Sequence, residues 1–146
     1  PDSITERSYP YASQLLTNEL ISQADLVLTM ERSHRSRVAE LSPAARSKTF
    51  TIPEAAELAE FVKLAIEDSD SEFGDNRELG FAELDPTKKL QWFTAELNEA
   101  RGFISPILDE IKDAHGADSI PHELAFTQIE KFATAFLKAQ SEIVNA

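Results

Sequence analysis

The sequence predicts a single α/β domain with a parallel sheet, spanning residues 1–146. Two short segments rich in strand formers, residues 25–30 and 49–52, are each followed by a helix-like segment. The first contains a run of apolar residues on both faces and is too short for a helix, which is typical of an interior strand covered by helices on both faces. The order strand, helix, strand, helix, followed by two more helices, indicates a layered α/β fold with right-handed crossovers.

The first half of the chain supplies both strands and the helices next to them. Residues 1–16 are expected to form an irregular lead-in, and Thr17 is the predicted N-cap of a short helix. The helix predicted over 31–41 places its three arginines in water and ends at Ser42-Pro43, because proline cannot continue a helix. Pro53 is expected in the first turn of the next helix, where its missing N–H costs nothing.

The second half predicts a loop and two helices. Residues 67–86 are acidic and interrupted by glycine and proline, which indicates a solvated loop. A helix is predicted over 87–101 with Gly102 as its C-cap, and residues 103–122 are expected to form a loop with one helical turn. The last helix, over 123–144, is predicted from apolar residues that recur at helical spacing: Ile129, Phe132, Ala133, Phe136, Leu137 and Ile143.

A sheet of two parallel strands is too small to be stable by itself. Further strands are therefore expected either within residues 1–16 and 103–121 or outside this chain, and we favour the second explanation. Trp92 and Phe93 are adjacent on one helix, so they cannot both face the same core. We expect Trp92 near the surface, either at an interface or covering the acidic loop.

Composition and charge exclude several classes of function. The net charge of −12 repels phosphate backbones, so nucleic acid is not an expected partner. The absence of cysteine excludes disulfides, thiolate metal sites and a cysteine nucleophile within these residues. No segment is apolar for long enough to cross a membrane and no leader is visible, so we expect a cytoplasmic protein with no membrane partner. The three histidines lack ligand spacing, and no metal or cofactor is expected.

Residues 15–35, LLTNELISQADLVLTMERSHR, resemble the low-molecular-weight protein tyrosine phosphatases, in particular the actinobacterial branch. In that family a helix ends in Ala-Asp, a buried strand follows, and the next helix starts with Met-acid-x-x-His. The segment TFTIPE at 49–54 is similar to the family's next strand and helix, and residues 100–121 and the final helix fit its C-terminal third. The resemblance implies a flavodoxin-like three-layer sandwich around a four-stranded parallel sheet, and hydrolysis of phosphotyrosine through a cysteinyl-phosphate.

That reaction requires a thiolate nucleophile, a cradle of N–H groups and an arginine, and an acid that protonates the leaving phenolate. The family carries the nucleophile and the cradle on a C-x(5)-R loop between its first strand and first helix, and the resemblance begins after that loop. The family's acid is in an Asp-Pro pair, which corresponds to His122-Glu123 when the chains are aligned on Ile120-Pro121. His122 can carry a proton near neutral pH, and Asp118 is a substitute acid. Ordinary surface roles stay open for both.

Two hypotheses of function follow. In the first, the N-terminal strand, phosphate loop and first helix of a phosphatase are missing here, and the complete protein acts on a phosphorylated tyrosine. In the second, the chain is a non-catalytic module that binds a partner or forms a homo-oligomer to complete its sheet. His34, with Arg32, Arg35 and Arg37, forms either an anion-binding face or a solvated helix face.

Overall fold

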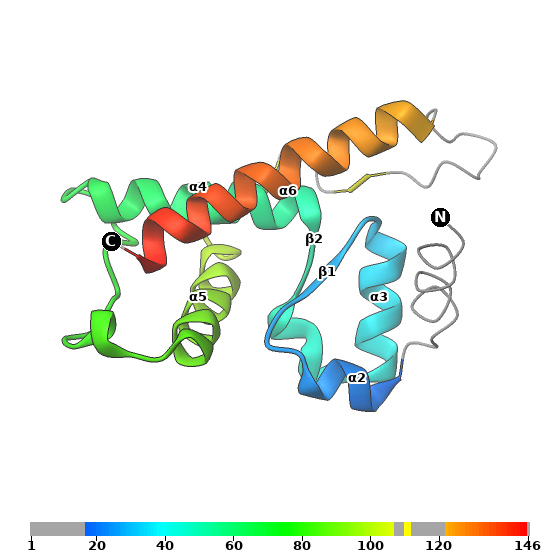
Figure 1. The fold of residues 1–146 in the computed structure, drawn as a ribbon, viewed down its shortest axis with the longest axis horizontal. Helices are drawn as coiled ribbons and strands as arrows, with labels where there is room; N and C mark the ends of the chain where they lie inside the picture. The colour runs from blue at the N-terminus through cyan, green and yellow to red at the C-terminus, as the bar shows by residue number, and fades with distance from the viewer. Residues whose placement is uncertain (1–16, 107–109, 112–121, 146) are drawn as a thin grey trace, which may run out of the picture.

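The computed structural model describes residues 17–106, 110–111 and 122–145 (Figure 1). In chain order the elements are α2 (Asn18–Gln23), β1 (Val27–Thr29), α3 (Arg32–Leu41), the 3-10 helix η1 (Pro43–Lys48), β2 (Thr49–Thr51), α4 (Ile52–Glu67), the 3-10 helix η2 (Phe81–Glu83), α5 (Pro86–Ala100) and α6 (His122–Val144). The predicted α/β class with a parallel sheet is confirmed. The expected lead-in and most of the expected loop before α6 lie outside the described residues.

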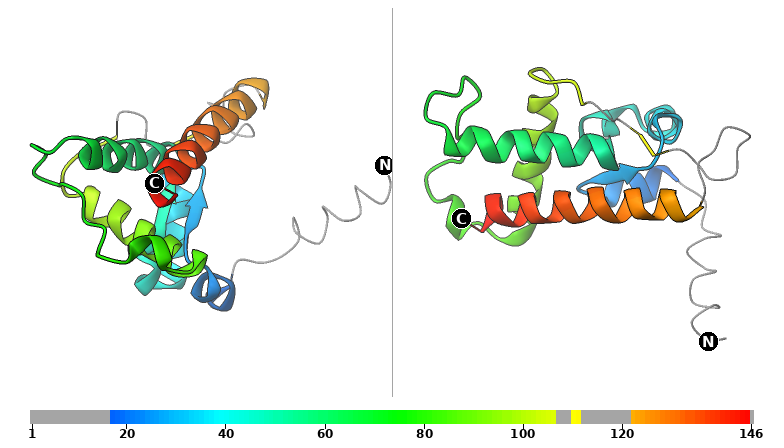
Figure 2. Two further views of the ribbon diagram at one scale, coloured as in Figure 1. Left: turned by 60° about the vertical axis from the view of Figure 1, so that its left-hand side comes forward. Right: turned by 90° about the horizontal axis from the view of Figure 1, so that it is seen from above.

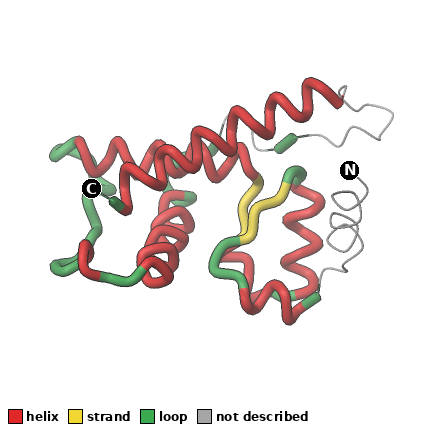
Figure 3. The backbone as a smooth tube through the Cα atoms, viewed as in Figure 1, coloured by secondary structure: helices red, strands yellow, loops and turns green. Residues whose placement is uncertain are grey.

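The two strands lie side by side in parallel, with Val27 opposite Thr49 and Leu28 opposite Phe50 (Figure 3). Within the described residues, each strand has the other as its one strand partner. All residues of β2 are buried, whereas Leu28 in the middle of β1 is 39% exposed. For this part of the chain, the prediction that the first strand is covered on both faces is therefore wrong, because the helices leave Leu28 at the surface.

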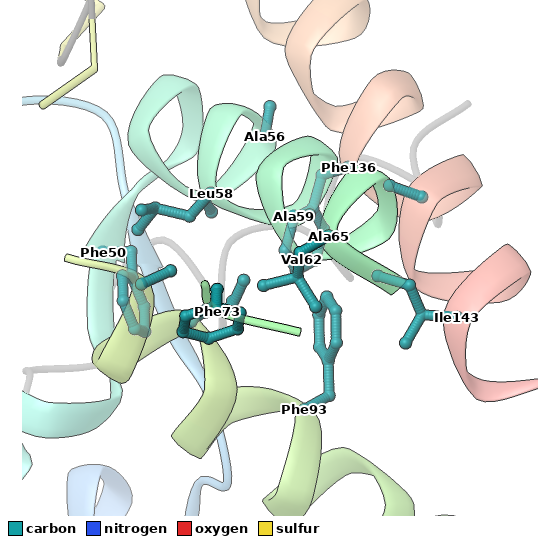
Figure 4. Close-up of a cluster of buried hydrophobic side chains, with 14 residues drawn as sticks. Phe50, Ala56, Leu58, Ala59, Val62, Ala65, Phe73, Phe93, Phe136 and Ile143 are labelled. Atoms are coloured by element: carbon teal, nitrogen blue, oxygen red, sulfur yellow. The ribbon is translucent and has the colours of Figure 1, made fainter. Parts of the chain in front are cut away.

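Apolar side chains gather in two clusters, which receive Leu26, just before β1, and Val27, the first residue of β1, respectively. Leu26 packs against the larger cluster and Val27 against the smaller one, as expected when successive strand residues point to opposite faces. The smaller cluster contains Ile21, Val38 and Ala45, from α2, α3 and η1. The larger cluster joins β2 to α4, α5 and α6, and it includes Phe50, Leu58, Val62, Phe93, Phe136 and Ile143 (Figure 4).

Helices α4 and α6 lie against each other and run in the same general direction (Figure 2). Helix α4 begins with a capping box, in which the Thr51 hydroxyl accepts the N–H of Glu54 and the Glu54 carboxylate accepts the N–H of Thr51. In α6, Phe136 and Ile143 are buried as predicted, but Leu137 is 60% exposed. Leu137 is turned about 100° around the helix from Phe136, which carries it away from α4.

None of the described helices is both long and apolar enough to span a membrane.

The end of α5 differs from the prediction of a glycine C-cap. The capping residue is Arg101 in right-handed helical conformation, and Gly102 does not adopt a positive φ. The N–H groups of Arg101 and Gly102 bond the carbonyls three residues earlier, at 3.3 and 3.1 Å. These bonds tighten the last turn and satisfy its carbonyls, so a left-handed residue is not needed.

The acidic segment between α4 and α5 is anchored by aromatic side chains rather than being only a solvated loop. Phe73 and Phe81 are buried, and the Phe81 ring lies 4.8 Å from the ring of Trp92. Half-buried Trp92 thus covers the acidic segment, one of its two expected roles. Arg77 donates to the Ile143 carbonyl of α6 at 3.2 Å.

A buried carboxyl group on α5 also contacts this segment. Asn76 donates its side-chain N–H to Glu96 Oε2 at 3.1 Å, and Glu96 is largely buried. Burial raises the pKa of Glu96, and the negative charges of Glu99 and Asp75 raise it further, against the opposing effect of the Asn76 hydrogen bond. Arg77 has the opposite influence on Asp75, because its hydrogen bonds lower the pKa of that carboxyl.

Replacing Glu96 by Gln should stabilise the protein at neutral pH. The raised pKa means that the folded state favours the protonated carboxyl, so the cost of ionising the buried group is present above the folded pKa and disappears below the ordinary value near 4.5. Thermal melts of Glu96→Gln and the parent chain should therefore differ at pH 7 and converge as the pH falls below that value. Glu83→Gln, which removes the same charge from an exposed site of the acidic segment, is the control. A Glu96→Gln advantage that persists unchanged in acid would contradict this account.

Candidate functional site

The structure leaves the two general-acid candidates largely unplaced. Asp118 lies outside the described residues. His122 is the first residue of α6, and its side chain is also outside the described part of the chain. Their proposed role therefore stays a prediction.

The chain that leads to these residues passes the carboxyl end of β1. The N–H of Ile111 donates to the Met30 carbonyl at 2.6 Å, directly after β1. Glu110 accepts the backbone N–H of Arg32 at 3.0 Å, and its second oxygen lies 3.3 Å from the Arg32 guanidinium. The carboxyl end of a strand is where open α/β sheets bind ligands. Residues 110 and 111, which precede Asp118 along the chain, are thus held at that end.

The predicted basic face of α3 is only partly a solvated face. His34, Arg32 and Arg37 are exposed. Arg35 is half-buried, and its Nη1 donates to Glu54 Oε1 at 2.7 Å, so the expectation that all three arginines face water is wrong for Arg35. The reason is that the capping box of α4 places a buried carboxylate opposite this side of α3.

Glu54 and Arg101 form the centre of a polar network. Glu54 is 6% exposed and pairs with Arg35 on one side and with Arg101 on the other, where Nε of Arg101 lies 3.2 Å from Oε2. Arg101 also donates to the carbonyls of Thr49 and Arg46. Its guanidinium lies 4.0 Å from the centroid of the Phe50 ring. One side chain therefore ties the end of α5 to β2, η1 and the start of α4.

Because of this network, the β1 and β2 edges of the sheet differ in whether side chains bond their backbone groups. On β2, the Thr49 carbonyl is bonded by Arg101 and the Thr51 N–H by Glu54, so side chains satisfy backbone groups that a further strand would otherwise bond. On β1, within the described residues, the Ile111 bond to the Met30 carbonyl lies beyond the end of the strand. Among the described residues, the sheet is thus capped by side chains at β2 and has no such cap along β1.

A cleft of about 740 Å³ lies beside this network, between α3, η1, the end of α5 and residues 104–106. Arg35, Arg46 and Arg101 line it, together with Glu54 and Glu40. Guanidinium groups in a cleft suit oxyanions. In the described part of the chain, no group of three His, Cys, Asp or Glu side chains is arranged to hold a metal ion.

Sequence reasoning includes Glu54 only as part of the segment TFTIPE and gives no functional role to Arg101 or Arg46. The capping-box pattern signals Glu54 locally. Arg101 is 47 residues further along the chain, and no local pattern links the two.

Arg101→Lys should destabilise the protein although it preserves the charge. Lysine lacks the planar fork that reaches Glu54 and the two carbonyls together, so the free energy of unfolding should fall by about 1–3 kcal/mol. Urea denaturation measures it, with Arg37→Lys on the exposed face of α3 as the matched control. Equal unfolding free energies for the two variants would show that the fork is not needed.

No protein-family model, curated protein or solved structure matches the chain.

Proposed function

We propose that these residues are the C-terminal part of a phosphotyrosine phosphatase of the low-molecular-weight type, whose nucleophile loop is supplied by a segment ahead of residue 1. The observation that carries this proposal is the asymmetry of the sheet. Side chains cap the β2 edge, whereas β1, the strand that the resemblance places next to the family's first strand, has no second strand partner among the described residues.

Uncovered apolar side chains on α6 support the same proposal. Phe126 and Leu137 are 65% and 60% exposed, and half-buried Ala133 lies between them at spacings of seven and four residues. These spacings place the three side chains on one side of the helix. A strand added beside β1 and the helix that follows it would have apolar surface to cover, at Leu28 and along this strip of α6.

The separation of Leu26 and Val27 into two clusters supports the layered arrangement that the proposal requires. Helices α2 and α3 contribute to one cluster and α4, α5 and α6 to the other. In the proposed three-layer sandwich, the added strand would extend the sheet between these two groups of helices.

In the proposed reaction, the upstream segment supplies the nucleophile and the 146-residue chain supplies the general acid. The thiolate of the supplied loop attacks phosphorus, the P–O bond to the phenol breaks, and water then hydrolyses the cysteinyl-phosphate. The departing phenolate takes a proton from His122, or from Asp118 as the alternative acid. The contacts of Ile111 and Glu110 support this assignment, because they bring the chain toward the carboxyl end of β1.

The 146-residue chain should not hydrolyse p-nitrophenyl phosphate above background, because it has no cysteine. The chain extended by its upstream residues should show vanadate-sensitive hydrolysis, provided that those residues contain a C-x(5)-R motif between an apolar strand and a helix. Cysteine-to-serine replacement in that motif is the control and should abolish turnover.

His122→Asp in the extended protein should raise turnover of substrates with poor leaving groups. Vanadate-sensitive activity of the cysteine-free chain, or an upstream sequence without the motif, would refute the proposal.

The edge of β1, which has no second strand partner among the described residues, and exposed Leu28 also favour the second function, a module that completes its sheet by self-association. Light scattering at increasing protein concentration separates the two hypotheses. If the phosphatase proposal is right, the 146-residue chain should associate and the extended chain should be monomeric, because the added strand occupies the edge. Association that persists with the extension, and is lost in Leu28→Lys, would favour the module instead.

A further inference from the structure

The guanidinium groups in the cleft beside Glu54 differ in how many of their N–H donors are already hydrogen-bonded to protein oxygens. Every nitrogen of Arg101 donates to a protein oxygen, so this residue is structural. Arg35 uses Nη1 for Glu54, while its Nε and Nη2 have no partner among the described residues. The side chain of exposed Arg46 also has no partner in the described part of the chain. Donors of Arg35 and Arg46 are therefore available to a ligand.

The fold holds these donors in place before any ligand binds. Glu54 fixes the guanidinium of Arg35 by their 2.7 Å contact, and Arg101 bonds the backbone carbonyl of Arg46 at 2.9 Å. A ligand would thus meet one guanidinium whose position is already set and a second on a fixed backbone. Such preorganisation lowers the entropy cost of binding.

The charge of the cleft selects the class of anion. Three arginines and two glutamates line it, which leaves one positive charge in excess. A carboxylate neutralises that excess, whereas a phosphate dianion would leave a negative charge beside Glu54. The planar carboxylate also matches the guanidinium fork. Apolar side chains of Ala39, Pro43 and Ile104 line the same space, so the ligand can carry an apolar body.

We propose that this cleft, at the edge of β2, binds a carboxylate that carries an apolar body, with Arg35 and Arg46 as its donors. Its volume of about 740 Å³ is within the range of small-molecule sites. Glu110 and Ile111 are not among the residues that line the cleft, and the inference does not depend on the proposed phosphatase activity. A free organic acid and the C-terminus of a peptide carry the same chemistry.

A titration of the 146-residue chain, followed by backbone amide NMR, tests the proposal. Hexanoate should shift the amides of cleft residues such as Ser36 and Ser105 in a saturable way, and hexanamide, which lacks the charge, should not. Acetyl-Ala-Ala-Leu, added separately, distinguishes a peptide C-terminus from a free acid by its affinity relative to hexanoate. Both sources satisfy the proposal if they bind in the cleft.

Arg46→Ala should weaken hexanoate binding about tenfold, since it removes a charged hydrogen bond. Arg37→Ala, an exposed position of α3 outside the cleft, should leave binding unchanged. Ser36→Asp should abolish binding by adding a negative charge at an exposed position of the cleft wall. The proposal is overturned if Arg46→Ala binds hexanoate as the parent does, if hexanamide binds equally well, or if inorganic phosphate binds more tightly than hexanoate.

Discussion

The burial of the Glu54 carboxylate is the constraint on which the arrangement of the described elements depends. A carboxylate removed from water is costly unless charged hydrogen bonds compensate it. Arg35 of α3 and Arg101 at the end of α5 supply that compensation from opposite directions. Because Arg101 also bonds β2 and η1, one buried charge determines where several elements meet.

The same network makes the two edges of the sheet differ within the described residues. With the backbone groups at the ends of β2 bonded to side chains, a further strand is accommodated more readily along β1, where Leu28 is exposed. Strand edges that are capped by side chains resist unwanted pairing. Within the described residues, the β1 side of the sheet is therefore distinct from the β2 side, which carries a charged cleft.

How much the sequence could predict depends on the range of the interactions. The two strands and the start of α4 follow from local patterns, since Thr51, Pro53 and Glu54 lie within one turn. The pairing of Arg101 with Glu54 joins distant segments and left no local signal, so the cleft could not be foreseen. Leu137 fitted a helical stripe, but periodicity does not show how wide the covered face is. Of the predicted acid residues, His122 begins α6 and Asp118 lies outside the described residues.

The contact of Trp92 with Phe81 makes the indole an optical reporter of one region. It is the single tryptophan of the chain, and it lies against Phe81, an anchor of the acidic segment. Its emission should consequently respond when that segment detaches from α5, while far-ultraviolet circular dichroism follows the helices as a whole. Unequal midpoints from the two signals would show the segment loosening ahead of the core.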